Sequence, residues 1–163
     1  MSTKPTLPDL LSIVARWFLA AVFIRMGLSK ALEPEQFIKL THQYNLMSSP
    51  WLLNSVAATL PWFEIFCGIL LLAGVAVRGT ALVLIAMLVP FTLVVLNRAL
   101  AIASAKSIAF CAVKFDCGCG AGEVLICHKL VENSFQILLA CWLLLGQGRQ
   151  LAARFSLLPS RKL

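Results

Sequence analysis

Charged residues are scarce in this 163-residue sequence, at 13% of the chain, whereas soluble domains average about 25%. Acidic residues are the scarcest of them, at seven against fourteen Lys and Arg. Hydrophobic residues instead reach 60%, and the mean hydropathy is +0.90. This composition excludes an ordinary soluble domain, so we expect an integral membrane protein whose first partner is the lipid bilayer.

Several cofactor motifs are also missing from the sequence. It has no haem attachment sequence, no glycine fingerprint of dinucleotide-binding proteins and no phosphate-binding loop. The net charge of +7 comes from basic residues scattered around the hydrophobic runs, not from a patch interleaved with aromatic residues. We therefore expect anionic lipid, and no nucleic acid, to be the partner of this charge.

Four hydrophobic runs are present, at residues 10–28, 56–77, 80–102 and 130–145. A helix needs about 20 residues to cross about 30 Å of hydrocarbon, and the last run is the shortest. We do not expect the first run to be a cleaved signal peptide, because it is long and contains Arg16 and Arg25. The sequence therefore predicts one domain over residues 1–163, an all-α integral membrane four-helix bundle with a Cys-containing outer loop between helices 3 and 4.

Four spans would place both termini and a short turn at Arg78-Gly79 on one side of the membrane. Basic residues divide evenly between the two sides, so they do not decide the orientation. Paired cysteines suit an oxidising compartment, which places the loop after the third span outside and both termini in the cytoplasm. In the other outer segment, Pro34 should start a short helix that continues to Tyr44 and lies on the membrane surface.

Among the ionisable side chains within or beside the predicted spans, we single out Arg16, Lys30 and Glu64 as intramembrane polar residues. Arg16 and Lys30 are fourteen residues apart, which places them within about 40° of each other on one helix face, while Arg25 points elsewhere. Glu64 lies about two turns inside the second span, where a carboxylate needs a partner or a wet cavity. We expect Arg16 and Glu64 to form an ion pair, with a proton or quinol site at Glu64 as the alternative.

Six cysteines fall into two groups. Cys67 and Cys141 lie within predicted spans, where a thiol packs like a small apolar side chain. The other four gather in the outer segment. These are Cys111, Cys117, Cys119 and Cys127.

Three hypotheses compete for the outer cysteines. In the first, Cys117 and Cys119 form a strained, exchangeable disulfide across one glycine, with Cys111 and Cys127 as a second or resolving pair. In the second, His128 joins Cys117, Cys119 and Cys127 as ligands for zinc or copper, although their spacing is unusual for such a site. In the third, two structural disulfides tie down the loop. The first is our leading interpretation, so we predict no metal.

A set of residues spread along the chain includes Arg16, Glu64 and Cys117-Gly118-Cys119. In order and spacing this set resembles the MauE/DoxX group of four-span, redox-associated membrane proteins, and its methylamine-utilisation MauE branch in particular. In the last span, Glu132-Asn133 stands where the group often has Arg-Asn. In the cysteine loop, Ala121-Gly122 stands where the group usually has Phe-Gly. The matching residues are Arg16, Gly27-Leu28-Ser29-Lys30, Pro34, Phe37, Tyr44, Leu60-Pro61, Glu64, Gly68, Gly74 and Asp116-Cys117-Gly118-Cys119-Gly120.

This resemblance implies a function in the bacterial inner (plasma) membrane, with the cysteine loop in the periplasm. The protein would support disulfide formation or a thiol-disulfide relay for an extracytoplasmic partner, as MauE is linked with maturation of the disulfide-rich small subunit of methylamine dehydrogenase beside a thioredoxin-like protein. Quinone, associated with DoxX-type relatives, is the implied electron acceptor. Cys117 and Cys119 would then be catalytic in a thiol-disulfide oxidoreductase. The alternative is a non-catalytic membrane subunit that packs against a larger redox or electron-transfer complex.

Overall fold

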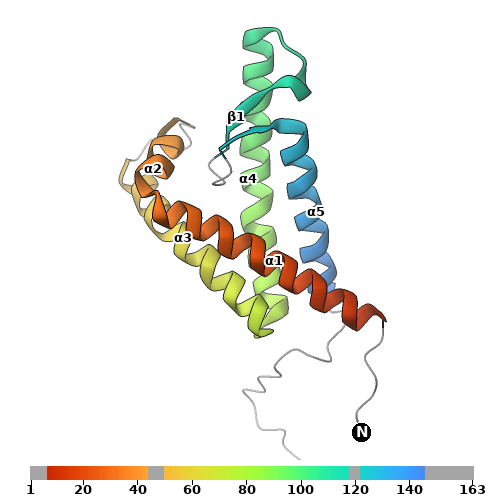
Figure 1. Cartoon of the computed structure of the whole chain (residues 1–163). Coiled ribbons are helices and arrows are strands. Elements are labelled where there is room, and N and C mark those ends of the chain that lie inside the picture. The colour runs from red at the N-terminus through yellow and green to blue at the C-terminus, as the bar shows by residue number, and fades with distance from the viewer. Residues whose placement is uncertain (1–6, 44–49, 118–121, 146–163) are drawn as a thin grey trace, which may run out of the picture.

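The structure, a computed structural model, describes residues 7–43, 50–117 and 122–145. Within these ranges the long helices are α1 (Leu7–Leu32), α3 (Pro50–Ala73), α4 (Val77–Lys106) and α5 (Ile126–Leu145), shown in Figure 1. The shorter elements are helix α2 (Pro34–Gln43), the 3-10 turn η1 (Phe110–Ala112) and the strands β1 (Lys114–Asp116) and β2 (Glu123–Leu125).

Three of the described helices are long and apolar enough to cross a membrane: Leu7–Leu32, Asn54–Ala73 and Val77–Lys106. They confirm the first three hydrophobic runs as helices, with bounds that differ by a few residues from those predicted. Helix α5 has 20 residues but is not among the three. It carries five strongly polar side chains, which lower its mean hydropathy: His128, Lys129, Glu132, Asn133 and Gln136.

The turn between the second and third hydrophobic helices lies earlier than predicted. Helix α3 ends at Ala73 and α4 begins at Val77, so Arg78 and Gly79 lie inside α4 and the predicted turn there is wrong. Gly74 adopts a left-handed conformation with φ of 72°, and the N–H groups of residues 74 and 75 donate to the carbonyls of Leu71 and Leu70. Glycine at this position ends the helix because it reaches positive φ without steric cost.

The segment between α4 and α5 contains a small β-hairpin, which the all-α prediction missed. Strands β1 and β2 pair antiparallel, with Phe115 opposite Val124. One further hydrogen bond, from the N–H of Ile126 to the carbonyl of Val113, extends the ladder into the first residue of α5. Helix α5 therefore begins at Ile126, four residues before the run predicted at 130–145.

The long helices alternate in direction along the chain. Helices α1 and α3 pack against each other as one pair and α4 and α5 as another, and α1 also contacts α5 (Figure 1). The indole Nε1 of Trp142 donates to the Ser12 hydroxyl at 3.1 Å, which joins the last turns of α5 to the first turns of α1. The start of α1 and the end of α5 therefore lie at the same end of the molecule.

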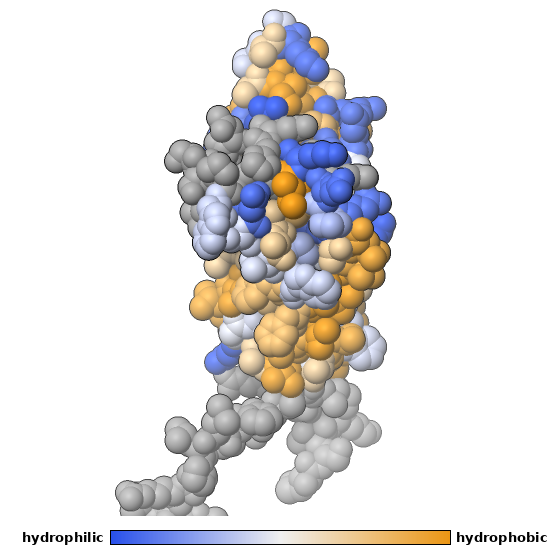
Figure 2. Space-filling model, turned by 90° about the vertical axis from the view of Figure 1, so that its left-hand side faces the viewer, coloured by the Kyte–Doolittle hydropathy of each residue, from blue (hydrophilic) through white to orange (hydrophobic). Residues whose placement is uncertain are grey.

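Two hydrophobic clusters fill the spaces between the helices. The larger one includes Leu19 and Phe23 of α1 and Leu71 of α3. The smaller one lies under the hairpin and includes Val95 of α4 and Ile126 of α5. Figure 2 shows an apolar surface over the lower part of the described chain and hydrophilic side chains gathered higher up.

Helices α1 and α3 approach closely because each carries a glycine at the contact. A Cβ atom on Gly27 would lie 2.6 Å from the Pro61 carbonyl oxygen, and one on Gly68 would lie 2.6 Å from the Ile24 side chain. Small residues at such contacts let helix backbones approach within a membrane.

We predict that Gly27→Ala destabilises the protein by about 1–3 kcal/mol, because the added methyl group meets a backbone oxygen that cannot rotate away. Gly79→Ala is the matched control. It lies in α4 with nothing within 4 Å of the added atom, so it should be neutral or stabilise by up to about 1 kcal/mol. The free energy of unfolding in lipid bicelles measures both changes, and equal stabilities would contradict the close contact.

Candidate functional site

The base of the β-hairpin is closed by a disulfide between Cys111 and Cys127. Cys111 is exposed in η1, and Cys127 is half-buried in the first turn of α5. Their Cα atoms lie 5.1 Å apart, and the two residues are separated by 16 positions in sequence. The bridge therefore joins the chain that leaves α4 to the beginning of α5, and holds the hairpin between them.

Cys117 directly follows β1, and its chemical state differs from that of the thiols in the helices. It is disulfide-bonded and only 2% exposed, in the hydrophobic cluster that includes Val113 and Ile126. Cys119 lies outside the described residues. Cys67 and Cys141 are free, and Cys67 belongs to the larger apolar cluster.

The bonded state of these sulfurs disfavours the metal-site hypothesis. Soft metals bind cysteine as the thiolate, and the sulfurs of Cys117 and Cys127 are both in disulfides. In the part of the chain that the structure describes, no three His, Cys, Asp or Glu side chains gather in a way that could hold a metal ion.

Glu64 is paired with Lys30, not with Arg16, so the predicted Arg16–Glu64 ion pair is wrong. The Lys30 Nζ atom lies 2.5 Å from Glu64 Oε1, and the two side chains are only 5% and 6% exposed. The Lys30 ammonium also lies 5.4 Å from the centroid of the Phe37 ring, on α2. The pair therefore connects α1, α3 and α2.

The antiparallel register of α1 and α3 explains why Arg16 does not reach Glu64. Gly27 lies against Pro61 and Glu64, and Arg16 is about three helical turns earlier on α1. There its Nε atom donates to the Leu71 carbonyl at 3.1 Å. The guanidinium lies against Gly74, where an added Cβ would come within 3.0 Å of it. Glycine at position 74 thus leaves room for the Arg16 side chain near the end of α3.

The prediction about the face of the first helix is confirmed. Arg16 and Lys30 are both buried, and Arg25 is exposed. Helical periodicity thus identified which cations point inward.

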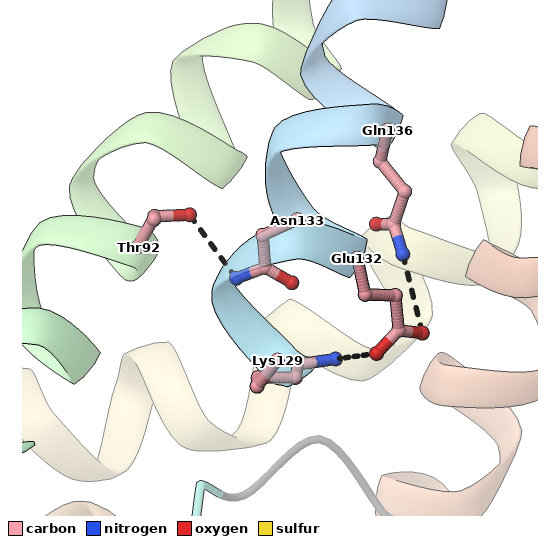
Figure 3. Close-up of polar contacts among 5 residues, drawn as sticks. All are labelled: Thr92, Lys129, Glu132, Asn133 and Gln136. Carbon is pink, nitrogen blue, oxygen red and sulfur yellow. Dashed lines mark hydrogen bonds and ion pairs between the residues drawn. The ribbon is translucent and has the colours of Figure 1, made fainter. Parts of the chain in front are cut away.

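A polar stripe on the inner face of α5 was not identified from the sequence. Lys129 Nζ lies 3.0 Å from Glu132 Oε2, and Gln136 Nε2 donates to Glu132 Oε1 at 3.5 Å (Figure 3). Asn133 Nδ2 donates to the Thr92 hydroxyl of α4 at 3.1 Å. The residues of α5 recur at i, i+3, i+4 and i+7, a spacing that marks one face of a helix and was available in the sequence.

The opposite face of α5 is apolar. Val131 is 70% and Leu138 67% exposed, and Phe135 is exposed beside them. Helix α5 is therefore amphipathic in the sense that suits a lipid environment, with its polar face against the protein and its apolar face outward.

Residues 8–146 match the sequence model of the family described as Methylamine utilisation protein MauE. The chain belongs to the MauE family. The matched range begins in the first turn of α1 and ends beside the last residue of α5, so the MauE domain contains nearly all of the described structure.

The family match and the three span-capable helices together make this chain a methylamine-utilisation-associated membrane protein. The resemblance to MauE noted in the sequence is confirmed. Neither the curated proteins nor the solved structures gave a match.

We predict that Glu64→Gln destabilises this MauE-family protein by about 3–5 kcal/mol, because it leaves the Lys30 ammonium buried without its counter-charge. Adding Lys30→Met should recover part of this loss, so that the two changes are non-additive by about 0.5–3 kcal/mol. The measurement is a double-mutant cycle of the free energy of unfolding in bicelles.

Two further variants test the specificity of this coupling. Glu35→Gln breaks an exposed pair with Lys39, whose atoms lie 4.0 Å apart, and should change stability little. Arg16→Met should add independently to Glu64→Gln, because Arg16 contacts the other end of α3. Coupling of Glu64 to Arg16, with none to Lys30, would contradict the pairing.

Proposed function

We propose that this MauE-family protein exchanges disulfides with an extracytoplasmic protein, and that Cys117 and Cys119 are the reacting couple. The observation that carries this proposal is the disulfide-bonded state of Cys117, beside a separate Cys111–Cys127 bridge. Cys67 and Cys141 are free thiols. Of the six cysteines in the sequence, Cys119 is then the one that remains to pair with Cys117.

The two pairs suit different tasks. A disulfide that closes a loop of about 15 residues stabilises a protein by about 3 kcal/mol in the chain-entropy account, and shorter loops give less. The Cys111–Cys127 bridge, with its separation of 16 positions, is therefore the structural one. A ring closed across Gly118 alone constrains the unfolded chain little, and strained disulfides of this kind are the ones that exchange readily.

The reaction follows the usual course of thiol-disulfide exchange. A thiolate of the partner attacks one sulfur of the Cys117–Cys119 couple, the bond between the two sulfurs breaks, and the other sulfur leaves as a thiolate. A second partner thiolate then attacks the mixed disulfide, so the partner gains a disulfide. The MauE-family protein is left as a dithiol that has gained two electrons and takes up protons from water.

A two-electron acceptor must reoxidise this dithiol before the next turnover. We propose quinone, the lipid-soluble acceptor that the resemblance implies. The buried ammonium groups of Lys30 and Lys129 are N–H donors of a kind that fits the carbonyl oxygens of a quinone. They would hold and orient its head group.

We propose that α5 is the fourth span, which completes a four-helix membrane bundle. Its 20 residues make a helix of about 30 Å, and its apolar face points outward. The start of α1 and the end of α5 lie at one end of the molecule, joined by Trp142 and Ser12. Both termini are then cytoplasmic in the bacterial inner membrane, and the hairpin faces the periplasm, where disulfides persist.

We predict that Cys117→Ser or Cys119→Ser alone traps a mixed disulfide with a thioredoxin-like or disulfide-rich periplasmic protein. The remaining thiolate attacks the disulfide of an oxidised partner and displaces one partner thiolate, and this protein has no second thiol to release the mixed disulfide that results. The measurement is a reducible, higher-mass band on a denaturing gel, followed by identification of the partner.

The matched control is the pair of changes Cys111→Ser and Cys127→Ser. These should trap no partner but lower the free energy of unfolding by about 3 kcal/mol, whereas Cys117→Ser with Cys119→Ser should barely change it. If the second double variant is the unstable one and neither single variant captures a partner, the cysteines are structural and the protein is a non-catalytic subunit.

We predict that a membrane-impermeant maleimide labels Cys117 and Cys119 in intact spheroplasts after mild reduction, because the hairpin faces the periplasm. Cys67 serves as the internal control, since it lies within the span-capable part of α3, away from the water phase, and should stay unlabelled. Labelling that requires opening of the inner membrane would reverse the proposed orientation.

A further inference from the structure

Three buried oxygen atoms in the membrane-spanning part of the described chain accept no hydrogen bond from the described residues. They are Glu64 Oε2, Asn133 Oδ1 and Gln136 Oε1. Gln136 is 0% exposed and Asn133 1%, so both side chains lie beneath the surface of the protein. Buried acceptors are seldom left without donors, so each of them indicates a bound group.

The orientation of Asn133 follows from its neighbour on α4. The Thr92 hydroxyl has one hydrogen, which it donates to the Leu88 carbonyl at 2.7 Å. Thr92 Oγ1 can therefore only accept from Asn133, so the amide NH₂ must face it (Figure 3). The Asn133 carbonyl oxygen is then directed away from Thr92 and needs a donor of its own.

The orientation of Gln136 is decided in the same way. Its partner Glu132 is a carboxylate, which accepts hydrogen bonds only, so the Gln136 NH₂ group faces Glu132 and the Gln136 carbonyl oxygen is left over. Glu64 uses Oε1 for Lys30, which leaves Oε2. The lack of a donor at each of the three oxygens thus follows from the hydrogen-bond chemistry and not from an arbitrary choice of amide orientation.

The charges around these acceptors restrict what can bind there. Lys30 and Glu64 form one ion pair, and Lys129 and Glu132 form another. Lys30 and Lys129 are both buried, and they belong to helices α1 and α5, which contact each other. The four charges cancel, so neither a cation nor an anion is favoured. A neutral hydrogen-bond donor meets the need of all three acceptors.

We propose that this cluster is a binding site for neutral hydroxyl donors, held by Glu64, Asn133 and Gln136 between α5 and the pair α1 and α3. The hydroxyl groups come from water or from a membrane-soluble alcohol or phenol, which offer the same O–H donor. Glu132, whose side chain is 41% exposed, marks the opening of the site toward solvent. This site stands whether or not the cysteines exchange disulfides.

The test uses the full chain in lipid nanodiscs with Cys141→Ala, so that Cys67 is the remaining native free thiol. Gln136→Cys introduces a thiol at the site, and Ala140→Cys is the matched control, one turn further along α5 and equally buried but in the apolar cluster. A negatively charged thiosulfonate reagent, which travels through water, should modify Gln136→Cys at least about tenfold faster than Ala140→Cys or Cys67.

Two added compounds distinguish the sources of the hydroxyl group. If 4-hexylphenol slows the labelling of Gln136→Cys and 4-hexylanisole, which lacks the O–H, does not, the site accepts a membrane-soluble phenol. If neither compound slows it, water is the occupant. Labelling of Gln136→Cys no faster than that of Ala140→Cys overturns the proposal.

A measurement on the native chain covers the case in which the Gln136→Cys variant does not fold. Solid-state NMR of the protein in liposomes should detect magnetisation transfer, from water or from added 4-hexylphenol, to the side-chain amides of Asn133 and Gln136. The transfer should exceed that to Ala140. Transfer no greater than that to Ala140 from both sources also overturns the proposal.

Discussion

A buried charge in the apolar interior needs a partner supplied by the protein, and the Lys30–Glu64 pair meets this constraint. The pair lies between α1 and α3, whose close approach depends on Gly27 and Gly68. A separation only slightly larger would leave both charges without a partner in a medium that solvates neither. The glycines and the ion pair therefore depend on each other. Phe37 brings α2 against the same ammonium.

The hairpin end of the molecule combines a fixed base with a disulfide-bonded cysteine, Cys117, directly after a strand. The Cys111–Cys127 bridge and the two short strands hold the hairpin to α5, and Cys117 lies on an apolar floor made by Val95, Val113 and Ile126. A rigid base matters for exchange, because attack on a disulfide requires the incoming sulfur to approach along a defined direction. Under the proposed function, the Cys111–Cys127 bridge would hold the hairpin in place while Cys117 takes part in exchange.

Helix α5 connects this outer end to the interior. Its apolar face, with Val131 and Leu138, points outward, and its polar face meets α4 through Thr92. Lys129, Asn133 and Gln136 are buried in this way, so their polar groups lower the hydropathy of the helix without lying on its outward face. The larger apolar cluster continues along the same helix with Ala140 and Leu143.

Local patterns in the sequence determined much of this protein. Composition and hydrophobic runs identified the three long apolar helices, Pro34 marked the start of α2, and helical periodicity placed Arg16 and Lys30 on the buried face. The gathering of cysteines and the resemblance to MauE also came from the sequence. The helices, the start of α2 and the buried face of α1 each depend on neighbours along one segment, so predicting them needs no tertiary information.

Contacts between segments were decided only by the tertiary structure. Helix register selected Lys30 as the partner of Glu64, because the register depends on where Gly27 of α1 meets α3 and where Gly68 of α3 meets α1. The sequence signal for the helix end at Gly74 is weak, because this glycine lies within a long apolar stretch. The signal for the pairing of β1 with β2 is also weak, because both strands are short and lie in an irregular stretch. The acceptors left over on Asn133 and Gln136 depend on what Thr92 and Glu132 already bind, which one segment cannot specify.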